Sequence, residues 1–286
     1  MEIKRIGKYS RVDENGYLIN HSNLHTSPKH WLDAITTVKN HYLAKWLDDI
    51  HSIYIRGSIA KGTAVDYFSD IDSIAVFKAE RFQATDACNR AEVKAWTKLV
   101  ENQLGTSYPF VAGLETELVP IKNILGGNHP YRFAIKIESS CIHGHNLAEQ
   151  ITPFKINHEI AFGVGKIHLR IEKFLSAYTE EDDHGKKLWM AWLMRRYLRL
   201  GMQLVMQDEQ LYTRDLFLCY ESFAKYYPSQ TANMYHALEL AINPKIVQEA
   251  ITFVRDFGSW LVDESDDKLR SWGYTQNRKM QWVFNT

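Results

Sequence analysis

The residues best suited to chemistry in this 286-residue chain are Asp70 and Asp72, which flank Ile71 at the start of an apolar run. Alternate side chains of a β-strand point to the same face, so Ile71 is predicted to face the core and both carboxylates the opposite side. Two such carboxylates are typical ligands of Mg²⁺, which takes its other ligands from water and substrate phosphates. The alternative is a solvated strand start, where aspartates are common.

A second chemical feature precedes the aspartates. Gly57 and Ser58 follow a short apolar strand predicted around residues 52–56. A turn of small residues from a strand into a helix leaves backbone N–H groups available to bind phosphate. Gly57 lets the backbone approach a phosphate closely, and Ser58 adds a hydroxyl donor. A phosphate site beside a cation site indicates chemistry on a nucleotide.

Two glutamates, Glu115 and Glu117, stand two residues apart in the β-like run 111–121. Glutamate is depleted in strands, so the pair indicates a functional requirement, although two solvated glutamates on a half-exposed strand edge are the alternative. A two-metal transfer needs a further carboxylate and a group that takes the proton of the attacking hydroxyl. Both glutamates can face the same cleft.

The spacing of these residues resembles a known signature. The sequence has Gly57-Ser58, then eleven further residues, and then Asp-Ile-Asp. This pattern is similar to the signature of the nucleotidyltransferase superfamily typified by DNA polymerase beta. Residues 56–72 are close in form to aminoglycoside and lincosamide nucleotidyltransferases. The resemblance implies that Asp70 and Asp72 bind the metal ions that bridge a triphosphate, and that a third acid lies on a later strand. The nucleotide-binding candidates are Gly57, Ser58, Lys61 and Gly62.

The third acid can be aligned in two ways that differ by one pleat. The stretch 117–120, Glu-Leu-Val-Pro, resembles the third-strand pattern of the family, whereas Leu114-Glu115 resembles the strand of streptomycin and spectinomycin adenylyltransferases that carries the proposed base. We take Asp70, Asp72 and Glu117 as the metal ligands and Glu115 as the general base. Most family members have Asp at the third position, so Glu is a departure. The match covers roughly residues 50–147, including a segment at 141–147 in which Asn146 replaces the usual acid.

Composition limits the remaining function classes. The chain has 34 Lys and Arg against 34 Asp and Glu, and this zero net charge argues against a broad nucleic-acid-binding face. Its three cysteines are far apart, which favours a reduced compartment over a disulfide framework. The first residues lack the apolar run of a signal peptide, and no stretch has the apolar length of a membrane span. We therefore expect a cytoplasmic protein with no membrane or DNA partner.

The predicted elements place these residues in an α+β fold with two domains. A hairpin is predicted at residues 9–20, around Asn15-Gly16, and an amphipathic helix at 28–47 with Ser27 as its N-cap. Further predicted elements are a strand at 71–77, a helix at 86–104 that stops at Gly105, a loop at 126–130 and a strand at 133–138. The catalytic domain, of α/β type with a mixed sheet, is assigned to residues 1–147.

Residues 148–286 are predicted to be an all-α domain. Its most apolar helix, predicted at 188–206, carries a polar stripe that includes Arg196 and Arg199. These arginines are candidates for a phosphate or acceptor cleft, and structural ion pairs are the alternative. The acidic runs at 180–183 and 263–267 are predicted to be solvated loops.

The combined expectation is an enzyme that transfers a nucleoside monophosphate, AMP from ATP, to a hydroxyl of an acceptor, with Mg²⁺ as cofactor. The acceptor is expected to be an antibiotic-like small molecule. The alternatives are a nucleotidyltransferase that acts on RNA or protein, as a toxin does, and a non-catalytic regulatory protein that keeps the fold and binds nucleotide. Intact Asp70 and Asp72 argue against the last.

Overall fold

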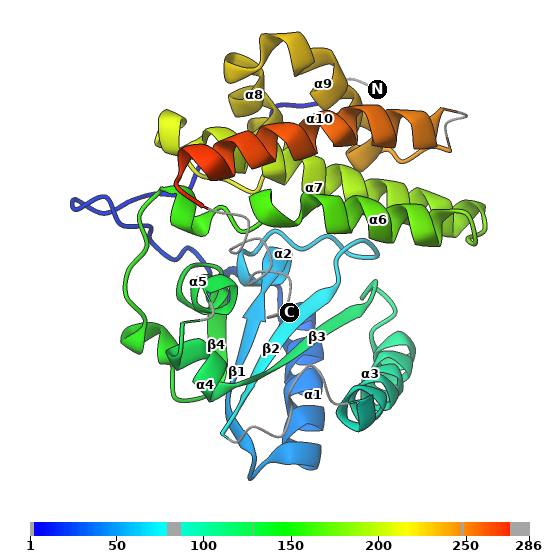
Figure 1. Cartoon of the computed structure of the whole chain (residues 1–286). Helices are drawn as coiled ribbons and strands as arrows, with labels where there is room; N and C mark the ends of the chain where they lie inside the picture. Colours follow the sequence, from blue (N-terminus) through cyan, green and yellow to red (C-terminus); the bar gives the residue numbers. More distant parts are fainter. Residues whose placement is uncertain (1–2, 79–86, 128, 247–248, 275–286) are drawn as a thin grey trace. The chain divides into compact units, whose positions relative to one another are not determined.

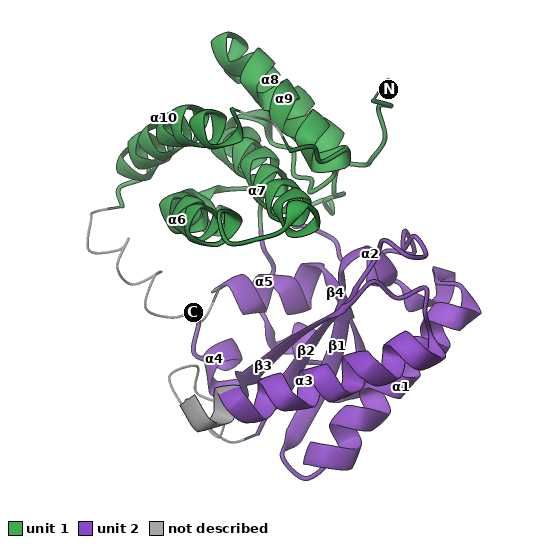
Figure 2. Cartoon of the chain, turned by 90° about the vertical axis from the view of Figure 1, so that its right-hand side faces the viewer, with its two compact units in different colours: residues 1–17, 155–286 green, residues 18–154 purple. Residues whose placement is uncertain are grey.

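The computed structural model describes residues 3–78, 87–127, 129–246 and 249–274, with the backbone alone at residues 87–90 and 129. The chain forms two compact units (Figure 2). Residues 18–154 make the sheet unit, and residues 1–17 together with 155–286 make the helical unit. The units thus divide after residues 17 and 154, where the sequence led us to expect a single division after residue 147.

The sheet unit is built on four strands in the order β3-β2-β1-β4 (Figure 1). The strands are β1 Ile50–Arg56, β2 Ile71–Phe77, β3 Leu114–Pro120 and β4 Ser139–Gly144. Strand β2 is parallel to β3 and antiparallel to β1, and β1 is antiparallel to β4. The mixed sheet and the α+β class confirm the prediction.

One face of the sheet is covered by two helices, α1 Lys29–Trp46 and α3 Ala87–Ser107. Three of their aromatic side chains pack together, with ring centroids 4.5 Å apart for Tyr42 and Trp96 and 4.9 Å apart for Trp46 and Trp96. Ile71 is fully buried against this layer, as the strand alternation predicted. Burial of these large rings stabilises the face of the sheet that lies behind Asp72.

The limits of these helices differ from the prediction in two places. The Ser27 hydroxyl does not cap α1 but donates to the backbone oxygen of Ile59 at 2.7 Å. Helix α3 also continues past Gly105 to Ser107. A glycine near a helix end weakens the helix without having to end it.

Two further helices belong to the sheet unit, α4 Ile121–Leu125 and α5 His129–Ile137. The strand predicted at 133–138 is therefore wrong, and the predicted loop is confined to Gly126 and Gly127 among the described residues. Phe133, Ala134 and Ile137 are buried at helical spacing. A short apolar run does not distinguish a buried strand from a helix by its periodicity, which is why the prediction failed.

Among its described residues the helical unit contains five longer helices, in agreement with the all-α prediction. They are α6 Ile167–Tyr178, α7 Asp183–Glu209, α8 Leu216–Tyr226, α9 Thr231–Ile242 and α10 Ala250–Ser271. The short helix α2, Gly57–Ala60, belongs to the sheet unit, and 3-10 turns occur at Leu24–Thr26, Leu147–Gln150, His158–Ile160, Val164–Lys166 and Pro228–Gln230.

Helix α10 runs through the acidic stretch 263–267, so the loop predicted there is wrong. Leu261 and Ser265 are buried one turn apart, and this packing keeps the stretch helical. Helix α7 is longer than predicted, because Asp182 caps it by accepting the N–H of Gly185 at 2.7 Å. None of the described helices has both the length and the hydrophobicity to cross a bilayer.

The hairpin predicted at residues 9–20 is present only as a turn. The N–H of Asp13 donates to the oxygen of Tyr17 at 2.8 Å, and Gly16 adopts the positive φ of 78° that the turn needs. Tyr17 then pairs with Lys155 in an isolated bridge instead of extending a strand pair.

Candidate active site

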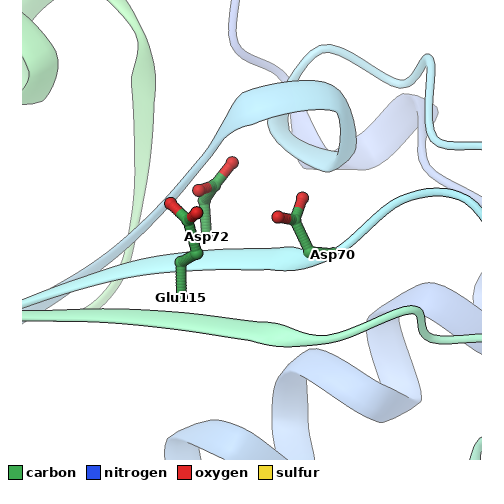
Figure 3. Close-up of side chains that lie close together, drawn as sticks. All are labelled: Asp70, Asp72 and Glu115. Carbon is green, nitrogen blue, oxygen red and sulfur yellow. The ribbon is translucent and has the colours of Figure 1, made fainter. Parts of the chain in front are cut away.

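Three carboxylates, Asp70, Asp72 and Glu115, converge on one side of the sheet (Figure 3). One carboxylate oxygen from each lies within 4.8 Å of the others. Asp72 and Glu115 are register partners on the parallel strands β2 and β3, and Asp70 directly precedes β2. The strand pairing therefore assembles the carboxylate cluster from residues more than forty positions apart.

The opposite face of the strands fixes this register. The hydroxyl of Tyr42, on α1, lies 2.9 Å from the Ser73 hydroxyl, which donates to the backbone oxygen of Glu115 at 3.2 Å. Because Ser73 uses its proton on that oxygen, Tyr42 donates to Ser73. Burial raises the pKa of Tyr42 well above its usual value, so the phenol stays protonated. The two consecutive hydrogen bonds from Tyr42 to Ser73 and from Ser73 to Glu115 thus hold Glu115 opposite Asp72.

The electrostatics of the cluster favour a bound cation. The Glu115 side chain keeps contact with solvent, yet partial desolvation and then the charges of Asp72 and Asp70 raise its pKa to about 7, against an opposing effect of Arg56. A proton on Glu115 relieves the repulsion among the three groups at neutral pH. A divalent cation would replace that proton and stabilise all three in the ionised form.

Glu117 lies one pleat farther along β3 and is engaged elsewhere. Its carboxylate accepts a hydrogen bond from the Arg56 guanidinium at 2.7 Å, while the same guanidinium nitrogen is 3.9 Å from an Asp72 oxygen. Burial and the neighbouring Glu117 raise the pKa of Tyr131, from α5. The structure therefore groups Glu115 with the aspartates and places Glu117 between Arg56 and Tyr131.

The residues proposed to bind phosphate lie in and just after α2. Gly57 has a φ of 74°, and a Cβ there would overlap the Asp72 carboxylate, so glycine is needed for both backbone conformation and space. Ser58 follows it in the first turn of α2, whose amides are free of intrahelical acceptors. Lys61 is exposed at the C-cap of α2. Gly62 has a φ of 67° and packs against Thr26.

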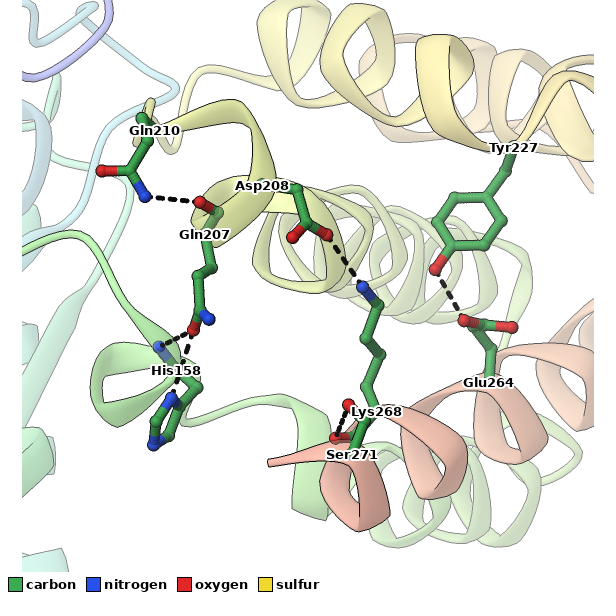
Figure 4. Close-up of polar contacts among 8 residues, drawn as sticks. All are labelled: His158, Gln207, Asp208, Gln210, Tyr227, Glu264, Lys268 and Ser271. Carbon is green, nitrogen blue, oxygen red and sulfur yellow. Dashed lines mark hydrogen bonds and ion pairs between the residues drawn. The ribbon is translucent and has the colours of Figure 1, made fainter. Parts of the chain in front are cut away.

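Arg196 and Arg199 lie on α7 and belong to the helical unit, whereas the carboxylates belong to the sheet unit. Farther along the same polar stripe, the Gln203 side-chain oxygen accepts the N–H of Gly163 at 2.7 Å. The side-chain oxygen of Gln207 accepts the N–H of His158 at 3.0 Å, as Figure 4 shows. These glutamines tie the 158–163 segment to α7, so this part of the stripe stabilises the helical unit.

Sequence reasoning did not find Arg56, Tyr42 and Tyr131. Arg56 stands next to Gly57. Its positive side chain, at the end of a strand predicted near two strands that carry acids, was a signal that could have identified it as a partner of those acids. Tyr42 belongs to the amphipathic helix predicted at residues 28–47, where its spacing indicates only a place in the core, and it is indeed fully buried. Tyr131 carried no signal, because its helix was not predicted.

Comparison with known proteins identifies a fold. No protein-family model matches the chain, and no curated protein sequence matches it. Among solved structures, the chain is similar to a spectinomycin adenyltransferase from Enterococcus faecialis, whose crystal structure contains ATP and spectinomycin. The similarity has a TM-score of 0.55 at 12% identity and covers 82% of this chain and 99% of the other. At this identity the comparison shows a nucleotidyltransferase-like fold.

Proposed function

We propose that the protein is a Mg²⁺-dependent nucleotidyltransferase that moves AMP from ATP to a hydroxyl of a small-molecule acceptor. The observation that carries the proposal is the cluster of Asp70, Asp72 and Glu115 beside the Gly57 turn. The fold is similar to that of an adenyltransferase whose structure holds ATP and a small acceptor, which supports ATP as the donor.

The cation would be held by Asp70, Asp72 and Glu115. Three carboxylate oxygens within 4.8 Å of one another suit a hard divalent cation, and a raised pKa on one of them is the response expected of acids brought together to share it. When bound, Mg²⁺ would offset the charge of the triphosphate and of the leaving pyrophosphate. This proposal moves the role of third metal ligand from Glu117 to Glu115, because Arg56 already neutralises Glu117.

The triphosphate would lie against the turn from β1 into α2. Gly57 has no Cβ that would displace the Asp72 carboxylate, and the amide and hydroxyl of Ser58 would supply two donors to the phosphates. Lys61 would add a positive charge from the end of α2, and Gly62 allows the chain to turn away. Arg56 would keep its charge next to Asp72 and so limit repulsion between the aspartate and the phosphates.

Glu115 would also receive the acceptor proton. It has two carboxylate oxygens, so one can contact the cation while the other accepts a proton. The acceptor O–H gives its proton to Glu115, the oxygen forms a bond to the α-phosphorus, and the bond from that phosphorus to the bridging oxygen breaks, releasing pyrophosphate. The role of Arg56 and Glu117 is to hold Asp72 in place beside this reaction.

The test is transfer of label from α-³²P-ATP to a panel of hydroxylated small molecules, with pyrophosphate release as a second readout. We expect transfer with the wild type and Mg²⁺, and none with Asp72→Asn, because the amide has no charge to hold the cation. The variant should keep the wild-type circular dichroism spectrum. Full activity of Asp72→Asn would remove the carboxylate assignment, and bound ATP without pyrophosphate release across the panel would favour a non-catalytic protein.

A further inference from the structure

The loop at residues 61–70, which joins α2 to β2, presents two neighbouring aromatic side chains to solvent. Tyr67 is 69% exposed and Phe68 is 84% exposed, while Val65 in the same loop is 56% exposed. Single exposed apolar side chains are common, but three within four residues form a patch, and such a patch indicates a contact with a ligand or partner. Phe68 stands two positions before Asp70, one of the three proposed cation ligands.

Hydrogen bonds to neighbouring segments of the sheet unit hold this loop in place. The N–H of Tyr67 donates to the backbone oxygen of Phe110 at 2.6 Å. The Asp66 carboxylate accepts the indole N–H of Trp31, on α1, at 3.0 Å. The backbone that carries the two aromatic residues is therefore ordered before any ligand arrives, so binding would not have to order it.

Tyr67 has a left-handed backbone conformation, with a φ of 68°. A bulky side chain is disfavoured in this region, and glycine would adopt the same conformation at a lower cost. Strained residues of this kind are found mainly at functional sites, where the surrounding structure holds them. The strain therefore indicates that Tyr67 is kept for what its ring contacts and not for the shape of the loop.

The loop stands at one end of the carboxylate cluster. Farther along β2, beyond Asp72, the ion pair of Glu117 with Arg56 lies over the same face of the sheet. At the other end, the chain passes from the loop through Asp70 into β2 (Figure 3). The carboxylates, the α2 turn and the loop all belong to residues 18–154, so one unit carries the whole arrangement.

We propose that Tyr67 and Phe68 form the surface on which the purine base of the donor nucleotide stacks. A purine is planar, and aromatic side chains offer it a flat apolar face. With the triphosphate against the α2 turn and its α-phosphate at the cation, the nucleoside would extend past Asp70 toward the loop. The identification of the ligand as the donor rests on the proposed function, and the stacking contact can be measured without any transfer.

The experiment is calorimetric titration of the full chain, in the presence of Mg²⁺, with α,β-methylene-ATP and separately with inorganic tripolyphosphate, which has the phosphates but no base. We expect Tyr67→Ala and Phe68→Ala each to raise the dissociation constant of the ATP analogue about tenfold, and to change that of tripolyphosphate less than about twofold. Tyr67→Phe keeps the ring and should bind the analogue as the wild type does. Leu99→Ala removes a side chain that is 57% exposed on α3, and it is the matched control that should bind both ligands normally.

Three results would overturn the proposal. The first is absence of analogue binding by the wild type. The second is unchanged analogue affinity in both alanine variants, which would assign the aromatic patch to a protein partner or to packing. The third is equal weakening of the analogue and of tripolyphosphate, because a lost base contact cannot affect a ligand without a base. Failure of the proposed function gives a different result: no transfer to any acceptor, while the alanine variants still weaken the analogue alone.

Discussion

Glu115 and Glu117 offer a matched test, because they lie on the same strand, face the same side and can each be changed to glutamine. Glu115→Gln removes a cation ligand and the proton acceptor, so kcat for transfer should fall by about 10²–10⁴-fold and Mg²⁺ affinity should decrease. Glu117→Gln touches neither cation nor substrate, so kcat should stay within about tenfold of the wild type.

The two variants should also change stability in opposite directions. The pKa of Glu115 is raised to about 7 in the folded protein, so at pH 8 its ionised form favours unfolding, and Glu115→Gln should raise Tm in EDTA. Glu117→Gln breaks an ion pair in which both side chains are less than a third exposed. The loss of this ion pair should lower the free energy of unfolding by about 1–2 kcal/mol, which corresponds to about 5 °C in Tm for a unit of the size of the sheet unit.

The measurements are steady-state pyrophosphate release, Mg²⁺ titration by calorimetry and thermal unfolding in EDTA at pH 8. Larger losses of kcat and Mg²⁺ affinity in Glu117→Gln, together with wild-type Mg²⁺ binding by Glu115→Gln, would refute the assignment of Glu115 as the third ligand. That outcome would return the third metal position to Glu117, and the β2–β3 register would no longer explain the site.

Three further predictions follow from the same geometry. Gly57→Ala should lower Tm, because the positive φ at this position alone costs an alanine about 1–2 kcal/mol of folding free energy. It should also lower transfer activity, because the new Cβ displaces the Asp72 carboxylate, and unchanged kinetics would contradict that contact. Saturating Mg²⁺ should raise Tm more at pH 8 than at pH 6, since below the pKa of about 7 a proton on Glu115 competes with the cation; an equal shift at both pH values would argue against it. Tyr42→Phe should lower the free energy of unfolding, measured by chemical denaturation, by about 1–2 kcal/mol, because the buried Ser73 hydroxyl loses its hydrogen bond from Tyr42. An unchanged free energy of unfolding would show that this hydrogen bond is not made.

Local sequence determined the donor half of the proposed site. The Gly-Ser turn and the alternation Asp-Ile-Asp depend only on residues a few positions apart, because strand pleat and backbone dihedrals are local properties. Ile71 is buried and the aspartates face the other way, as that alternation required. The amphipathic helix α1 and the predominantly helical second half were predictable for the same reason, since a long periodic pattern specifies a helix without its partners.

Tertiary structure decided the features that depend on distant partners. The choice between Glu115 and Glu117 depends on the register of β3 against β2, and a shift of one pleat is invisible in either strand alone. The run around Phe133 became a helix, since a short apolar segment takes the form that its packing allows. The contacts of Arg170 and Lys173 with Trp192 were equally out of reach of the sequence, because they form only where α6 packs beside α7. Local spacing sets which way a side chain points, and only packing sets what it meets.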